Sequence, residues 1–210
     1  MKVVDGRIHH ESPPIVISLF DYSGEWSKPY RVAGYRVLQV DTKFGFDILN
    51  WNYKAIRKED VIGVLAAPPC TDFALSGAQY WKRKDADGST AKSVELVRKT
   101  IEIINHFQPV FHAIENPVGR FKHLFPELGK PYYFHPYEFG DPWQKKTCLW
   151  GRFNEPTKTP VEPIRFTAQG GWTQMLGGTS EKTKELRSIT PEGFANAFFA
   201  ANNPWTQSCG

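Results

Sequence analysis

The fold is decided by the stretch VIGVLAAPPC, residues 61–70. Its first seven residues form a continuous apolar run, which is typical of a strand buried on both faces of a sheet. Two prolines then end the strand, because proline lacks the backbone N–H that a sheet needs. Residues 15–20 and 110–114 are similar apolar runs, and they end at Asp21 and Glu115. Such strands, separated by helical stretches, predict an α/β fold with a mostly parallel sheet and helices on both faces.

The other elements follow from periodicity and punctuation. Strands are predicted at 15–20, 36–40, 61–67, 110–114, 132–137 and 146–150, and helices at 30–34, 91–107 and 191–201. The strongest helical pattern lies in 91–107, where apolar residues repeat at a spacing of three or four. Thr190 is the expected N-cap of the last helix, with Pro191 at its first position. Residues 155–163 are predicted to be an extended connection, and the residues 170–184 a loop rich in glycine, serine and threonine.

Composition sets limits on the class of protein. The chain has 210 residues, a length that suits one domain, and its net charge of +4 permits nucleic-acid binding without requiring it. There is no apolar run of about 18 residues and no signal pattern, so we expect a cytoplasmic protein without a membrane span. Three widely separated cysteines do not suggest a disulfide framework or a zinc site. The adjacent His9 and His10 are expected to be solvated, so no metal is predicted.

Polar side chains stand at the ends of four predicted strands. These residues are Asp21, Asp41, Cys70 and Glu115. Because the carboxyl ends of parallel strands meet at one edge of a sheet, we expect the four side chains to converge on one ligand crevice. The small residues that follow Asp21 would let the backbone approach a ligand, and Asp41 lies where a ribose-binding carboxylate is found in a doubly wound fold. An ordinary turn with a helix cap is the alternative for this segment.

Cys70 and Glu115 each have a chemical and a structural interpretation. A thiol held by a rigid Pro-Pro turn can act as a nucleophile, although a lone cysteine is equally often a small core residue. A carboxylate at the end of a buried strand could donate a proton at neutral pH if burial raised its pKa. The alternative is a glutamate that caps a helix or forms a salt bridge. The residues themselves leave both alternatives open.

The order of these motifs resembles the DNA (cytosine-5) methyltransferases, and the compact phage-type members most closely. The resemblance rests on Phe20-Asp21-x-Ser23-Gly24, Asp41, Pro68-Pro69-Cys70, Glu115-Asn116-Pro117 and Gln144-Lys145-Lys146. It extends to residues 146–150, 177–184 and 186–191, and it covers the chain from 15 to about 202. It implies a Rossmann-like class I fold that uses S-adenosylmethionine.

The resemblance also implies roles for individual residues. Cys70 would attack carbon 6 of a cytosine, Glu115 would contact ring nitrogen 3, and Lys146 would be the basic residue that contacts the base. Implied cofactor contacts are Phe20, Asp21, Ser23, Gly24, Asp41, Asp47, Pro68 and Ser188. The implied substrate contacts are Pro69, Asn116, Gln79, Trp81, Lys82, Arg83 and Lys84. Most of these substrate residues lie in the segment 71–92, which would be the mobile catalytic loop, with basic residues for phosphates and an aromatic residue for the gap left by a flipped base.

The chain departs from the family pattern in ways that bear on its substrate. The first loop has less glycine, Pro117 stands where many relatives have valine, and Lys145 and Lys146 replace arginines. Only about thirty-five residues separate Gly151 from Arg187, where classical relatives carry a large target-recognition domain. We therefore predict one methyltransferase domain over 1–210, with a core at 15–151, a short loop-rich insert at 152–187 and a closing helix at 188–202.

These departures define the expected function and its alternatives. The expected function is cytosine carbon-5 methylation of DNA by a phage-encoded monomer with short or relaxed sequence recognition, which would protect phage DNA from restriction inside the bacterial host. A separate specificity subunit is left open. One alternative is the same chemistry on single-stranded nucleic acid or a free cytosine nucleotide. Others are an inactive relative that acts as a binding subunit, and a different donor group.

Overall fold

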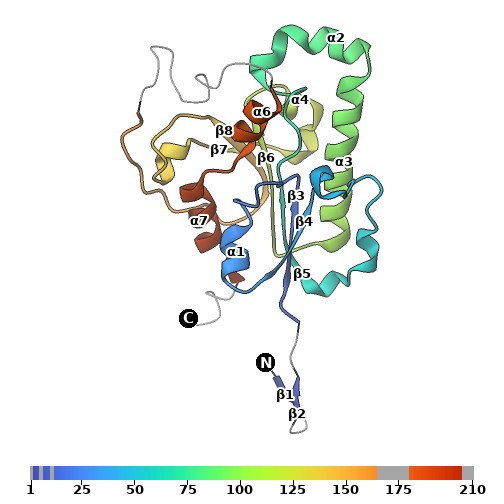
Figure 1. Ribbon diagram of the computed structural model, residues 1–210, viewed down its shortest axis with the longest axis vertical. Helices are drawn as coiled ribbons and strands as arrows, with labels where there is room; N and C mark the ends of the chain where they lie inside the picture. The colour runs from blue at the N-terminus through green and yellow to red at the C-terminus, as the bar shows by residue number, and fades with distance from the viewer. Residues whose placement is uncertain (1, 5–6, 10–11, 165–179, 205–210) are drawn as a thin grey trace.

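The computed structural model describes all residues except 1, 5–6, 10–11, 165–179 and 205–210. Its centre is a six-stranded sheet with the order β4-β3-β5-β6-β8-β7 (Figure 1). The strands are β3 (Ile15–Leu19), β4 (Arg36–Val40), β5 (Val61–Ala66), β6 (Phe111–Pro117), β7 (Tyr132–Phe134) and β8 (Thr147–Arg152). The first four strands in this order are parallel, whereas β8 is antiparallel to β6 and β7 is antiparallel to β8. The predicted α/β fold is confirmed, with an antiparallel pair at one edge.

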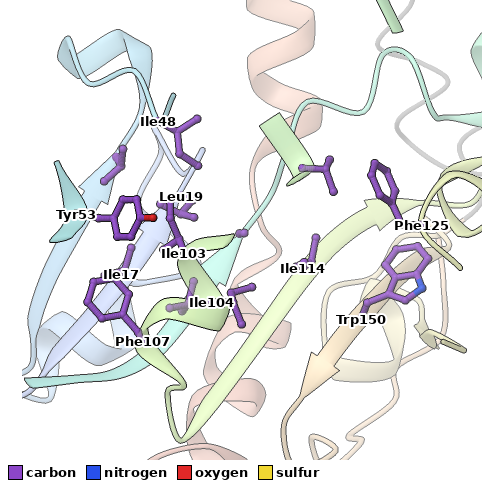
Figure 2. Packing of buried hydrophobic residues seen from close by; sticks show 14 of the residues in the cluster. Ile17, Leu19, Ile48, Tyr53, Ile103, Ile104, Phe107, Ile114, Phe125 and Trp150 are labelled. Atoms are coloured by element: carbon purple, nitrogen blue, oxygen red, sulfur yellow. The ribbon is translucent and has the colours of Figure 1, made fainter. Parts of the chain in front are cut away.

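Helices cover both faces of the sheet. Helix α3 (Ser89–Phe107) packs on one face, while α1 (Lys28–Val32) and α7 (Glu192–Ala201) pack on the other (Figure 1). Figure 2 shows Ile103, Ile104 and Phe107 of α3 among the strand residues Ile17 and Ile114. On the opposite face, Phe194 and Phe198 of α7 are buried. The apolar runs of β3 and β5 are therefore continuous because these central strands are buried on both faces.

Short elements complete the chain. The helices α2 (Trp81–Ala86), α4 (Phe121–Leu124) and α6 (Glu181–Ser188) lie in the connections. The strands β1 (Lys2–Val4) and β2 (Arg7–His9) form a separate antiparallel hairpin. Short 3₁₀ helices occupy Thr42–Phe44, Tyr53–Ala55, Lys58–Asp60, Leu75–Tyr80, Pro126–Leu128 and Pro136–Phe139. Among the described residues, no helix is both long and apolar enough to span a membrane.

Two sequence predictions about the C-terminal part are wrong. The loop predicted to reach residue 184 ends earlier, because Ser180 caps a helix by accepting the Thr183 N–H at 3.2 Å; residues 170–179 of that prediction lie outside the described part. Thr190 is not the N-cap of α7, since Pro191 has extended dihedral angles and takes that position. The amide of Gly193 donates instead to the Asp141 carboxylate at 2.9 Å, a tertiary contact that local sequence does not reveal.

Candidate active site

The predicted polar residues do stand at the carboxyl edge of the parallel strands. Asp21, Asp41 and Cys70 follow β3, β4 and β5, and Glu115 lies two residues before the end of β6. The segments that carry Cys70 and Glu115 are joined by Asn116, whose side-chain amide donates to the Pro68 carbonyl at 3.1 Å. Asn116 is fully buried, so this predicted substrate contact instead fastens two strand ends together.

The nucleophile candidate sits in a tight turn. The Cys70 carbonyl accepts the backbone N–H groups of Phe73 at 3.0 Å and Ala74 at 2.9 Å. Phe73 is fully buried, and its ring lies 5.3 Å and 5.9 Å from the rings of Phe121 and Phe125. A buried aromatic anchor three residues after the thiol therefore limits the positions that the thiol can take.

Backbone hydrogen bonds then join the segment that follows Cys70 to the segment that follows Glu115. Leu75 N–H donates to the Val118 carbonyl, and Arg120 N–H donates to the Phe73 carbonyl, each at 2.9 Å. Between them, Ala74 and Gly119 form an isolated antiparallel bridge. We call this contact the 73–120 zipper. It sets the separation between the chain that follows Cys70 and the chain that follows Glu115.

Burial dominates the electrostatics of the pair. Burial raises the pKa of the Glu115 carboxyl, and the nearby Lys145 ammonium opposes this rise. Burial also raises the pKa of the Cys70 thiol, and the charge of Glu115 raises it further, while Lys145 and Arg187 act in the opposite direction. A carboxyl with a raised pKa keeps its proton closer to neutral pH, so this glutamate is suited to act as an acid.

Lys145, rather than the predicted Lys146, lies beside Glu115. Lys145 and Glu115 line the same small cavity, together with Thr147 and Ser188, and the Lys145 ammonium donates to the Arg187 carbonyl at 2.8 Å. Lys146 is exposed, and its Nζ atom lies 5.0 Å from the centre of the Tyr133 ring. The two lysines are adjacent in sequence and point to different sides, so Lys145 faces the small cavity that Glu115 lines and Lys146 faces Tyr133.

The loop after β3 is organised by Asp21. Its buried carboxylate accepts hydrogen bonds from Ser18 Oγ at 2.8 Å, Ser27 Oγ at 2.9 Å, Gly24 N at 2.9 Å and Ser23 Oγ at 3.3 Å. Phe20 adopts a left-handed conformation with φ of 59°, which a non-glycine residue rarely does without compensating contacts. Asp21 and Ser23 were predicted to contact a cofactor, and here they shape the turn that holds Phe20.

The segments that follow β3 and β4 also present polar and aromatic side chains at the surface. Asp41 is half-buried, and one of its oxygens accepts the Lys43 N–H at 2.9 Å. Asp47 accepts from Leu49 N at 3.0 Å and from the Asn50 side chain at 2.7 Å. The exposed rings of Tyr22 and Phe44 lie 5.2 Å apart, and sequence reasoning had not singled out either residue.

Known proteins identify the family. The chain is 30% identical to a frog virus 3 (isolate Goorha) protein to which DNA (cytosine-5)-methyltransferase activity is ascribed, in a 199-residue alignment that covers 81% of this chain and 92% of the viral protein. The chain belongs to the DNA (cytosine-5)-methyltransferase family. The type II methyltransferase M.NmeDI of Neisseria meningitidis serogroup C is also 30% identical, over 76 residues that cover 36% of this chain and 16% of that protein. No protein-family model matches the chain.

A solved structure supports the methyltransferase fold. It is described as a DNA modification methyltransferase encoded within an E. coli prophage, and it superimposes with a TM-score of 0.50 at 16% sequence identity. The match covers 80% of this methyltransferase and 56% of the prophage protein, so the chain spans little more than half of that structure. At this identity the likeness supports the Rossmann-like fold alone.

The residues predicted to contact substrate fall into two groups in this methyltransferase. Gln79, Lys82 and Arg83 are exposed, as a surface for nucleic acid requires. Lys84 is engaged within the protein, because its ammonium lies 2.6 Å from the buried Asp72 carboxylate and 2.8 Å from the Thr71 carbonyl. Trp81 is half-buried as well. The prediction that Lys84 binds phosphate is therefore not supported by its contacts.

The remaining predicted residues lie near the carboxyl ends of the parallel strands. Pro68 is buried beneath the turn, and Pro69 is exposed. Ser188 is exposed at the end of α6, where its hydroxyl donates to the Glu185 carbonyl at 2.8 Å. Glu185 in turn forms an ion pair with Lys43, so α6 is tied to the chain that follows Asp41. Figure 1 shows α6 at the carboxyl end of the parallel strands, the edge of the sheet where the site is predicted.

Proposed function

We propose that the chain methylates carbon 5 of cytosine in DNA by way of a covalent bond between the Cys70 sulfur and carbon 6. The observation that carries this proposal is the joining of two strand ends, one with a thiol and the other with a half-buried carboxyl, by the 73–120 zipper and by Asn116. Lys145 supplies a positive charge beside both groups. Cytosine carbon 5 is a weak nucleophile, so a thiolate must first add to the ring.

The proposed steps use the chain's own groups. The Cys70 thiol gives its proton to solvent, and its sulfur bonds to carbon 6 while Glu115 gives its proton to ring nitrogen 3, which leaves an electron pair available at carbon 5. S-adenosylmethionine would supply the methyl group to carbon 5 and would leave as S-adenosylhomocysteine. Carbon 5 then loses its proton to solvent, the carbon 5–carbon 6 double bond forms again, and the bond between carbon 6 and the Cys70 sulfur breaks. Nitrogen 3 returns its proton to Glu115 and the Cys70 thiolate takes up a proton from solvent, so the protein ends in its starting state.

The surface formed by the segments that follow β3 and β4 suits S-adenosylmethionine. Asp41 is half-exposed, and its carboxylate can accept hydrogen bonds from ribose hydroxyls. The exposed faces of Tyr22 and Phe44 can stack on an adenine ring. In this proposal Phe20, Asp41 and Asp47 hold the cofactor, whereas Asp21 and Ser23 keep the turn in shape.

The proposed substrate is duplex DNA with a short or relaxed recognition sequence. The connection from β8 to α6 is short, which leaves little protein to read base edges. We also propose that residues 1–210 act as one methyltransferase domain, as a monomer and with a phage origin. The resemblance to compact phage-type members supports the phage origin. Transfer of labelled methyl from S-adenosylmethionine to duplex DNA, followed by digestion to nucleosides, tests this function. The expected product is 5-methylcytosine, whereas label that appears only in single strands or in a free cytosine nucleotide would contradict duplex DNA as the substrate.

The phosphate-binding surface can be tested separately. Each cation that neutralises a phosphate contributes roughly 0.9 to the slope of log affinity against log salt concentration. Replacing both Lys82 and Arg83 by methionine should therefore reduce that slope by about 2. Lys84→Met is the matched control, because Lys84 is already paired with Asp72, and it should leave the slope unchanged. A slope that falls equally in both variants would contradict this assignment of the surface.

A further inference from the structure

Arg120 is the most fully engaged cation near the catalytic turn. It lies five residues after Glu115, and only 12% of its side chain is exposed. Its Nε atom donates to the Asp72 carbonyl at 2.8 Å, and its two terminal nitrogens donate to Asp85 at 2.9 Å and to Thr90 at 2.7 Å. All three nitrogens of the guanidinium are therefore directed at the segment that follows Cys70.

The same guanidinium also covers an aromatic ring. Its central carbon lies 4.8 Å from the centre of the Trp81 ring, at the start of α2. Arg120 thus contacts the beginning, the middle and the end of the stretch from Asp72 to Thr90. A planar guanidinium with fixed donor directions can hold several partners at once, which a lysine ammonium does less well.

Asp72 closes the arrangement from inside. It is buried, its carboxylate forms the ion pair with Lys84, and it accepts a hydrogen bond from the Ser93 hydroxyl in α3. Its backbone carbonyl accepts from Arg120. Asp72 stands two residues after the proposed nucleophile, so these contacts fix the chain immediately after Cys70.

We propose that Arg120 is a positioning residue that holds residues 72–90 in place before DNA binds, so that the strand carrying the acid also orders the loop carrying the nucleophile. Arg120 acts through Asp72, Trp81, Asp85 and Thr90. It does not bind phosphate itself, because its donors are already directed at protein acceptors. We call the contacts of Arg120 with Asp72, Trp81, Asp85 and Thr90 the clasp. The catalytic role of the loop in this inference rests on the proposed function, whereas the clasp itself depends only on these contacts.

The clasp can be measured without activity. Hydrogen exchange of the ligand-free protein should show residues 75–90 exchanging about tenfold or more faster in Arg120→Met, because local opening then breaks fewer contacts. Arg120→Lys should recover only part of this protection. Arg98→Met is the matched control, since Arg98 forms an ion pair with Glu127 at 2.7 Å and its guanidinium lies 5.6 Å from the centre of the Phe125 ring, and both partners lie outside 72–90.

A second readout separates positioning from general stability. Formation of a covalent adduct with duplex DNA that contains 5-fluorocytosine should slow by about 100-fold in Arg120→Met, with the Kd for S-adenosylmethionine within twofold of wild type. Thr90→Val removes one acceptor with less disturbance and should give a smaller change in the same direction. Unchanged exchange at 75–90, or faster exchange spread evenly over the chain, would overturn the proposal. An inactive wild-type protein would contradict the proposed function. The hydrogen-exchange result would still test the clasp, because that measurement does not depend on activity.

Discussion

Gly119→Ala should separate the segment that follows Cys70 from the segment that follows Glu115. A Cβ atom at this position would lie 1.9 Å from the Phe73 carbonyl oxygen and 2.9 Å from Leu75 N, both in the backbone of the chain that follows Cys70. Backbone cannot rotate away as a side chain can, so the zipper must open by about 1.1 Å to bring the first contact to 3.0 Å. Overpacking of this kind costs roughly 1–3 kcal/mol of stability. A displacement of about 1 Å near the reacting groups can slow a reaction by roughly 100-fold.

The assay compares stability with the rate of adduct formation. For a chain of this size, a loss of about 1–3 kcal/mol should lower the Tm by roughly 2–12 °C. Gly77→Ala is the control, because a Cβ there meets only the Thr71 carbonyl oxygen at 3.4 Å, an ordinary contact, and should change neither quantity. The expected result is a fall in the adduct rate at temperatures where Gly119→Ala remains folded. Wild-type rates in a folded Gly119→Ala variant would refute the claim that the zipper sets the geometry.

Two further predictions follow from the charges around the thiol. Lys145→Met should slow alkylation of Cys70 at pH 8, because the lysine lowers the pKa of that thiol, whereas Lys146→Met should leave the alkylation rate unchanged. Peptide mapping by mass spectrometry measures the alkylation rate of Cys70. Equal slowing in the two variants would contradict the placement of Lys145. For Glu115, burial raises the pKa in the folded state, so the folded protein binds the proton more tightly and stability falls as pH rises from the ordinary carboxyl pKa through the raised one. The Tm of Glu115→Gln relative to wild type should therefore increase between pH 4 and pH 8, and a constant difference would show that the carboxyl is not strained by burial.

The strand ends of the site were predictable because their signals are local. Apolar runs such as those that precede Asp21 and the Pro-Pro-Cys70 turn need only a few neighbouring residues to be recognised. Helix α2 and the contacts of Lys84 were not predictable, because they depend on Asp72 and Arg120, which are distant in sequence from one another. The sequence therefore predicted a mobile catalytic loop with basic residues for phosphates, and it gave no sign of these internal contacts.

The choice between Lys145 and Lys146 illustrates a second limit. Residues 147–150 of β8 are buried on both faces, so the sequence has no alternation that would show which side of the strand faces the crevice. The register between β6 and β8 decides which lysine lies beside Glu115. Glu115 stands opposite Leu149, and Lys145 is four residues before Leu149, so Lys145 lies on the same side of the sheet as Glu115. The role of Asp21 was hidden for a similar reason, because its partners Ser18 and Ser27 come together only when the turn forms.

The covalent bond to Cys70 is the claim on which the mechanism depends. Incubation with S-adenosylmethionine and duplex DNA containing 5-fluorocytosine should trap the protein, since a fluorine at carbon 5 cannot leave as a proton does and the thiolate is not expelled. A denaturing gel should show a protein–DNA adduct for wild type and for Cys148→Ala, whose buried thiol has a pKa raised to about 12 by burial. Cys70→Ser should give no adduct while it still binds S-adenosylmethionine. An adduct that persists in Cys70→Ser, or no adduct in a wild-type protein that binds the cofactor, would contradict the account.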